Sequence, residues 1–249
     1  MAARPGKAAV AAEPCTSSWR VIDVPSPTFS IIVPVLNEAA GLMQLAAHLA
    51  PLSRAGAQVL LVDGGSHDST PELARHAGLQ VIGSERGRAI QMNAGAAHAT
   101  GDILVFLHAD TRLPEGALDL IGNGLAETPC WGRFDVLIAG RPAMLRVVSH
   151  MMNWRSRLTG IATGDQTMFM RREAFEAVDG FPVQPLMEDI ELSRRLGTFS
   201  RPVCLRARVA TSGRRWETRG VWTTIVLMWR LRWAYWRGVA PAVLAQAYR

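Results

Sequence analysis

Four short, almost continuous apolar runs alternate with helical stretches between residues 29 and 110. The runs cover residues 30–36, 58–62, 79–82 and 103–107, and predicted helices cover residues 41–52 and 88–99, with a further helix after residue 66. Strands that are apolar along their whole length are typical of a parallel sheet covered by helices on both faces. The chain is therefore predicted to form a Rossmann-like α/β domain with a mostly parallel central sheet.

Polar residues follow three of these predicted strands at the point where each strand ends. Asn37 and Glu38 follow the first run, Asp63 follows the second, and Asp110 follows the fourth. In an open parallel sheet the carboxyl ends of the strands share one edge, and ligands bind outside that edge. We therefore expect Glu38, Asp63 and Asp110 to line one site.

Two of these carboxylates suggest a nucleotide ligand. Asp63 precedes Gly64, Gly65 and Ser66, so it could accept hydrogen bonds from ribose hydroxyls while the glycines let a ligand approach the backbone. Its alternative role is to organise the turn. Asp110 is a natural Mg²⁺ or Mn²⁺ ligand beside a diphosphate, or else a helix or turn cap. His108 could be a second metal ligand, a residue that supports a metal ligand, or an ordinary histidine packed in the protein.

The pattern changes after residue 129, where strands are predicted at 131–138, 167–170 and 203–209 and helices at 142–158 and 187–196. Glu188 and Asp189 fall at the start of the last of these helices. One of them could take a proton from an acceptor hydroxyl, although the helix dipole alone favours acidic residues there. Because the dipole also weakens a carboxylate as a base, this role requires a late proton transfer.

The basic residues point to an anionic ligand. The chain has 27 basic and 21 acidic residues, a formal net charge of +6, which suits a phosphate-bearing ligand, a nucleic acid or an anionic membrane. No nucleic-acid-binding motif is present. Arg88 opens a predicted helix whose N–H groups favour phosphate. Arg215 could clamp a diphosphate, while Trp216 could stack on a sugar or pack in the core. A solvated surface is the alternative for each basic cluster.

Together these segments resemble a family-2 glycosyltransferase with the GT-A fold. The matching segments occur in the family's order and comprise residues 31–38, 62–66, 88–95, 106–111, 180–182, 188–189 and 215–216. More narrowly, residues 87–88, 91–93, 131–135 and 163–166 are typical of small bacterial glycosyltransferases linked to arsenosugar biosynthesis, a subgroup associated with selenium-domain and radical-SAM proteins. The sequence is similar, more loosely, to carotenoid-acid glycosyltransferases.

The resemblance implies an inverting enzyme that moves a sugar from a nucleotide-diphosphate donor to a hydroxyl acceptor, with help from a divalent metal. Asp189, beside Glu188, would be the general base. Asp110 would bind the metal, and His108 stands where the family's Asp-x-Asp motif has its first carboxylate. The residues implied to bind the donor are Pro34, Asn37, Glu38, Asp63, Gly65, Arg88, Asn93, Asp165, Gln166, Arg215 and Trp216. Of these, Arg215 and Trp216 would also close over the diphosphate, and Asp165 and Gln166 would line the sugar or acceptor side.

Two other functions remain open. A nucleotidyltransferase shares this topology and its metal carboxylate, but it usually carries a glycine-rich loop after the first strand, which residues 34–38 lack. A non-catalytic module that binds a sugar nucleotide or a lipid is disfavoured because Asp63, Asp110 and Asp189 are all present. The acceptor is open as well, and a lipid or a small metabolite would each fit.

The ends of the chain differ from its middle. Residues 1–27 are predicted to be a disordered tail, residues 28–216 the glycosyltransferase domain and residues 217–249 an amphipathic helical segment. Three scattered cysteines, Cys15, Cys130 and Cys204, favour reduced thiols in a cytosolic protein.

The C-terminal segment is rich in tryptophan. Residues 221–236 are almost entirely apolar but fall short of the roughly 20 residues that span a bilayer. On a helix, one face would carry Trp222, Trp229, Trp233 and Trp236, flanked by Arg230, Arg232 and Arg237. This pattern fits a peripheral contact with the inner face of the cell membrane through residues 221–237. A helix buried by the domain or by a second subunit is the alternative.

Overall fold

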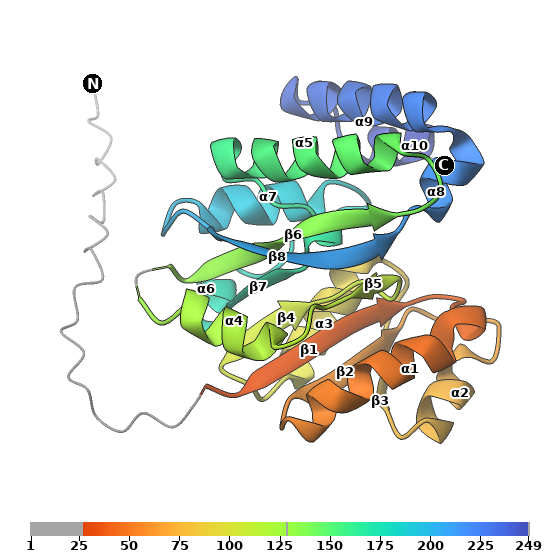
Figure 1. The fold of residues 1–249 in the computed structure, drawn as a ribbon, viewed down its shortest axis with the longest axis vertical. Coiled ribbons are helices and arrows are strands. Elements are labelled where there is room, and N and C mark those ends of the chain that lie inside the picture. The colour runs from red at the N-terminus through yellow and green to blue at the C-terminus, as the bar shows by residue number, and fades with distance from the viewer. Residues whose placement is uncertain (1–26, 128, 249) are drawn as a thin grey trace, which may run out of the picture.

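The computed structural model describes residues 27–127 and 129–248, so the predicted tail and Cys15 lie outside the described residues, apart from Pro27. The strands of the described part are β1 (Phe29–Val35), β2 (Gln58–Asp63), β3 (Gln80–Gly83), β4 (Ile103–Phe106), β5 (Thr111–Arg112), β6 (Trp131–Ala139), β7 (Met168–Arg171) and β8 (Val203–Ser212). They form a single sheet in the order β3-β2-β1-β4-β7-β6-β8-β5 (Figure 1).

The first half of the sheet is parallel. β1 pairs with β2 and β4, and β2 pairs with β3, all in parallel register. Val35 lies opposite Asp63, which lies opposite Gly83. The strands therefore end together, and the residues that follow them meet at one edge. The predicted α/β architecture with a mostly parallel sheet is confirmed.

Helices cover both faces of this half (Figure 1). On one face α1 (Ala39–Arg54) packs Leu42 and Leu45 against Ile31. On the other, α3 (Arg88–His98) packs Met92 against Ile32. A Cβ at Gly95 would collide with Ile32 and Val62, so glycine lets α3 lie close to the sheet. α2 (Thr70–His76) connects β2 to β3.

The second half of the sheet is mixed. β7 runs antiparallel to both β4 and β6, while β6 and β8 are parallel. The two-residue strand β5 and the short helices α4, α6 and α8 were not predicted, because elements of so few residues carry almost no periodicity. The helices of this half are α4 (Ala117–Gly124), α5 (Met144–Thr159), α6 (Arg172–Ala177), α7 (Glu188–Leu196), α8 (Arg214–Arg219), α9 (Val221–Trp236) and α10 (Pro241–Tyr248).

The tryptophan-rich helix α9 is present and buries the face opposite its tryptophans. Leu231 packs with Leu244 of α10 and with Met187, just before α7. The tryptophan side of the helix stays open, with exposed fractions of 67%, 66%, 61% and 80% for Trp222, Trp229, Trp233 and Trp236. The part of the chain that the structure describes therefore does not cover this face. Among the described helices, none is long and apolar enough to cross a membrane. The predicted boundary after residue 216 falls inside α8.

Candidate functional site

The loops after β1 and β2 are bonded to each other at the edge of the sheet. Asn37, in a left-handed conformation with φ 54°, donates its N–H to Ser66 Oγ at 2.9 Å and accepts the N–H of His67 on its side-chain oxygen at 2.9 Å. The N–H of Glu38 donates to Thr70 Oγ1 at 2.8 Å. The loop is thus held in one shape before any ligand arrives.

Asp63 organises the second of these loops. Its carboxylate accepts the N–H groups of Gly65 and Ser66, each at 3.1 Å, and the Ser66 hydroxyl. This is the turn-forming role that the sequence left open beside donor binding. Gly65 has φ 82°, and a Cβ there would meet nothing within 4 Å, so a ligand can approach its backbone. Pro34 sits half-buried inside β1, opposite Val62.

Gln91 of α3 ties the two strand ends together. Its amide NH₂ donates to the carbonyl oxygens of Val35 and Val62, both at 2.8 Å, and its side chain is buried. The side chain also packs so closely on Gly64 that a Cβ there would lie 2.8 Å from it. Gln91 thus fixes the backbone from which Asn37, Glu38 and Asp63 project, a role that its place in a helix pattern did not reveal.

Charged groups gather where β1 and β4 end. Burial raises the pKa of Glu38, Arg214 opposes that rise, and the negative charges of Asp110 and Asp68 add to it. Asp110 itself is exposed. These four groups mark the outer part of the edge as a mixed cluster that is open to solvent at Asp110.

Arg215 and Trp216 come to this cluster from α8. Burial lowers the pKa of Arg215, as does the nearby Arg88, while Asp165 and Asp110 oppose the change. The guanidinium of Arg215 also lies 4.5 Å from the centre of the Tyr248 ring. Trp216 is half-buried and packs on the main core, which is the packing role that the sequence left open beside stacking.

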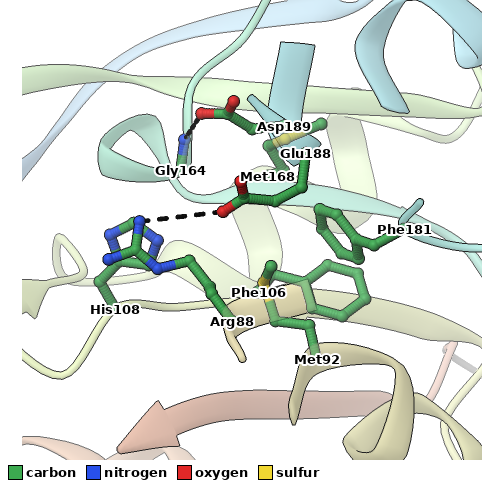
Figure 2. Close-up of a pocket in the computed structure, with 9 residues that line it drawn as sticks. All are labelled: Arg88, Met92, Phe106, His108, Gly164, Met168, Phe181, Glu188 and Asp189. Carbon is green, nitrogen blue, oxygen red and sulfur yellow. Dashed lines mark hydrogen bonds and ion pairs between the residues drawn. The ribbon is translucent and has the colours of Figure 1, made fainter. Parts of the chain in front are cut away.

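A small pocket of about 10 Å³ is lined by residues of α3, β4 and α7 (Figure 2). Its polar lining includes Arg88 from the start of α3 and Glu188 and Asp189 from the start of α7, and its apolar floor is formed by Met92, Phe106, Met168 and Phe181. A volume of this size holds about one water molecule. The pocket is connected with the charged cluster through Arg88, which lines the pocket and acts on the pKa of Arg215.

Glu188 is the more buried of the two adjacent carboxylates. Burial raises the pKa of Glu188, the negative charge of Asp189 raises it further, and Arg88 opposes the rise. Arg88 Nη1 lies 4.0 Å from Glu188 Oε1 (Figure 2). α3 and α7, which are almost 100 residues apart in the sequence, therefore meet across the pocket through this pair.

Asp189 is held by backbone groups. Its Oδ2 accepts the N–H of Gly164 at 2.9 Å (Figure 2), and its Oδ1 accepts the N–H of Ile190 at 2.8 Å. Met187, the residue just before α7, has φ 66° and turns the chain into the helix. The carboxylate is thereby fixed in direction while the side chain remains partly accessible.

The turn at residues 163–166 links Asp189 to His108. His108 Nδ1 lies 3.4 Å from Asp165 Oδ1, and a Cβ at Gly164 would collide with the His108 ring. Desolvation acts to raise the pKa of Asp165, but the hydrogen bond and charge of His108, with Arg88 and Arg215, outweigh it and lower that pKa. Both ring nitrogens of His108 border this turn.

Two residues predicted to contact a donor are instead bonded to the protein. The Asn93 side chain donates to the Phe181 carbonyl at 2.8 Å and accepts the Phe181 N–H at 2.9 Å, which holds Phe181 in the pocket. Gln166 is fully buried, accepts from the N–H of Thr163, and donates to Asn153 of α5 at 3.3 Å. Both side chains shape the site from behind.

Two arginines that the sequence analysis did not assign to the site lie beside Asp189. Burial lowers the pKa of Arg155, from α5, to about 10; Arg232 lowers it too, and Asp189 opposes the change. Burial also lowers the pKa of Arg232, from α9, with Asp189 and Asp165 opposing. Arg232 was expected to flank the tryptophan face, but it lies on the inner side of α9. Arginines in amphipathic helices usually mark a solvated face, so no pattern distinguished this pair.

A divalent metal fits Asp110 only with ligands from elsewhere. No group of three His, Cys, Asp or Glu side chains with metal-binding geometry occurs among residues 27–127 and 129–248. Mg²⁺ is usually held by one or two carboxylates together with substrate phosphates and water. The exposed carboxylate of Asp110 suits such a site, whereas His108 faces Asp165.

Comparison with known proteins gives consistent results. The family model described as glycosyl transferase family 2 matches residues 30–178. A beta-monoglucosyldiacylglycerol synthase of Synechocystis is 26% identical over 250 residues, which cover 87% of this chain and 51% of that protein. A PGL/p-HBAD biosynthesis glycosyltransferase of Mycobacterium bovis is 38% identical over 97 residues, covering 36% of this chain and 38% of that protein. The chain thus spans about half, or less, of the length of these relatives.

The fold is also that of a solved mannosyltransferase. The enzyme from Pyrobaculum calidifontis, in complex with GDP-Man and Mn²⁺, superposes with a TM-score of 0.60 at 24% identity, covering 89% of this chain and 69% of that one. At this identity the similarity supports the fold alone.

Proposed function

The chain belongs to glycosyl transferase family 2, and on this basis we propose that it transfers a sugar from a nucleotide-diphosphate donor to an acceptor hydroxyl, with inversion at the anomeric carbon. The observation that carries the proposal is the meeting of two groups of residues at one pocket. Arg88 and His108 come from the strand edge where a donor would bind, and Asp189 lines the same pocket from α7.

In this proposal the donor lies along the edge formed by β1, β2 and β4. The loops of Asn37, Glu38 and Asp63 hold the nucleoside, and the exposed backbone at Gly65 lets it approach. Arg88 and Arg215 neutralise the diphosphate. Asp110 would hold Mg²⁺ or Mn²⁺, which supplies positive charge to the leaving diphosphate, and His108 steadies Asp165 behind it. Pro34, Asn93, Gln166 and Trp216 support these groups through the backbone and the core.

Asp189 is the proposed general base. Its two backbone hydrogen bonds fix the direction of its carboxylate. In this proposal it takes the proton late, when the bond from the sugar to the diphosphate is largely broken. Glu188, buried against Arg88, positions the diphosphate side of the pocket.

The test is a donor screen with Asp189→Asn. Nucleotide release from UDP-hexoses and GDP-hexoses is measured with Mg²⁺ or Mn²⁺, and donor affinity is measured by calorimetry. Removal of a general base is expected to slow turnover about 10²- to 10⁴-fold with little change in donor affinity, whereas Glu191→Gln, on the same helix, leaves turnover unchanged. Asp110→Ala should abolish the dependence on metal. Failure of the wild type to bind any nucleotide sugar would refute the proposal.

We also propose that the enzyme belongs to the arsenosugar-type subgroup and acts in the cytosol at the inner face of the membrane. The segments 87–88, 91–93 and 163–166 support the subgroup. In the structure they form the start of α3, the Gln91 tie and the turn that holds Asp189. The donor assay tests this assignment when it is repeated with lipids and with small metabolites as candidate acceptors.

The exposed tryptophan face of α9 is proposed to contact anionic lipid. Tryptophan prefers the interface between water and hydrocarbon, and flanking arginines are attracted to anionic headgroups. Arg230 is exposed beside the tryptophans, and the guanidinium of Arg237 lies 5.1 Å from the centre of the Trp233 ring. The neighbouring helix α5 adds exposed apolar residues, namely Val147, Met151, Trp154 and Leu158, each at least 50% exposed.

Liposome flotation tests this contact without removing the helix. The variant Trp229→Ser/Trp233→Ser should lose most of its binding to phosphatidylglycerol vesicles and keep its melting temperature. Phe199→Ser, which removes another exposed aromatic ring (58% exposed), should bind as the wild type does. Equal flotation of all three proteins would exclude the membrane contact.

A further inference from the structure

Two buried guanidinium groups beside Asp189 lack hydrogen-bond partners. Across the residues that the structure describes, Nε and Nη2 of Arg155 and Nε of Arg232 are shielded from solvent and make no hydrogen bond. The two arginines come from neighbouring helices, α5 and α9 (Figure 1), and each is close enough to the other and to Asp189 to interact electrostatically. The two guanidinium groups are therefore close to each other, and neither forms an ion pair with a carboxylate of the described residues.

The same region shows how this protein normally treats buried arginines. Arg133, which is fully buried, pairs with Asp135 and donates to Ser156 Oγ and the Asn153 carbonyl. Arg157 forms two hydrogen bonds with the same Asp135, at 2.8 and 2.9 Å. Buried polar groups are almost always satisfied, so the unpaired donors of Arg155 and Arg232 call for a ligand that residues 27–127 and 129–248 do not supply.

The groups near these two arginines differ from those near Glu38. The groups that interact with Arg232 are Asp189 and Asp165, and those that interact with Arg155 are Arg232, Asp189 and Arg133. Neither arginine acts on Glu38 or Asp110, whereas Arg214 and Arg215 do. Arg155 and Arg232 are thus separate from the groups that act on Glu38, and both interact with Asp189.

We infer that Arg155 and Arg232 form a binding site for an anionic group of the acceptor, of the phosphate class, next to the hydroxyl that receives the sugar. This inference rests on the proposed function, because it places the anion on the acceptor side of the proposed base. Guanidinium groups bind phosphate through charge-assisted and often bidentate hydrogen bonds. Fixing the anion there would bring a neighbouring hydroxyl to Asp189.

The phosphate could belong to a lipid headgroup or to a soluble metabolite, and the binding assay separates the two. UDP or GDP with Mg²⁺ is first added to saturation, so that the donor side is occupied. Octyl phosphate and glycerol 3-phosphate are then titrated calorimetrically, with octyl alcohol and glycerol as neutral counterparts. Tighter binding of octyl phosphate indicates a lipid acceptor, and equal or tighter binding of glycerol 3-phosphate indicates a soluble one.

Arg155→Gln and Arg232→Gln should each weaken binding of the phosphate probes about tenfold or more, and Arg155→Lys should weaken it less because the charge remains. Arg146→Gln removes the same charge from an exposed position on α5 and should bind as the wild type does. Phosphate probes that bind no better than neutral ones, or equally well to all variants, would overturn the inference. Absence of UDP and GDP binding would instead refute the proposed function, and titration of phosphate without nucleotide would still test the arginines.

Discussion

Replacing Arg155 by methionine is expected to stabilise the ligand-free protein. Burial and the charge of Arg232 lower the Arg155 pKa from its ordinary value to about 10, and at about 1.36 kcal/mol per pKa unit this lowering amounts to about 3 kcal/mol. At neutral pH the residue is charged in both the folded and the unfolded state, so the whole cost is present. The cost disappears only as the pH rises above about 10.

Methionine fills a similar volume without a charge, but its packing will not be ideal. We therefore expect a net gain of about 2 kcal/mol, which raises the melting temperature of a domain of this size by roughly 4–8 °C. Thermal unfolding followed by circular dichroism measures the shift. The same variant should bind the phosphate probes weakly, because it lacks the guanidinium that would hold the phosphate. Groups that are kept for function in this way often lower stability.

Arg133→Met is the matched comparison, because Arg133 is buried but fully bonded. Its removal leaves the Ser156 hydroxyl and the Asn153 carbonyl without their donor, which costs about 1–3 kcal/mol. The two substitutions should thus move the melting temperature in opposite directions. If Arg155→Met destabilises the protein as Arg133→Met does, Arg155 has partners in the folded state and the reasoning fails.

Three further changes test how the site is built. Burial and Asp189 raise the Glu188 pKa above 4.5, so the wild type loses stability as the pH rises through that folded-state pKa. Urea unfolding between acidic and neutral pH should show that Glu188→Gln removes this loss. An unchanged pH dependence would contradict the assignment of the loss to Glu188. Gln91→Leu leaves the Val35 and Val62 carbonyls without their donor, so it should lower the free energy of unfolding by about 1–3 kcal/mol. It should also weaken nucleotide binding in calorimetry, and an unchanged affinity would show that the Gln91 hydrogen bonds are not needed to shape the nucleotide site. Gly95→Ala should destabilise α3 by about 1–3 kcal/mol in the same unfolding assay, whereas Gly41→Ala in α1, where a Cβ meets nothing, should not.

The parallel half of the fold could be predicted because its strands are buried on both faces. Ile31, Leu61 and Val105 lie in unbroken apolar runs, and such runs leave few alternatives to a covered sheet. The mixed half was less predictable, since β5 and α8 are too short to show a period. Strand direction there depends on pairing between distant segments, such as β4 with β7.

The sequence predicted which loops meet at the site, but it predicted less well the direction in which their side chains point. Asp63, Asn93 and Gln166 occur in the expected segments, yet each carries hydrogen bonds within the protein. Sequence spacing places a residue on an element, but competition among nearby donors and acceptors decides its direction. Arg155 and Arg232 were missed for a related reason: only the packing of α5 on α9 reveals that their charges are unpaired.

Helix α9 has tryptophans on its outer face and Arg232 on its inner face, and this arrangement restricts how its sequence can change. Each added residue rotates all following side chains by about 100°. One residue inserted inside α9, between Trp229 and Arg232, would rotate Arg232, Trp233 and Trp236 by about 100° relative to Trp222 and Trp229. The tryptophan face and the inward Arg232 could then no longer be kept together. The length of α9 itself should therefore vary much less than that of surface loops.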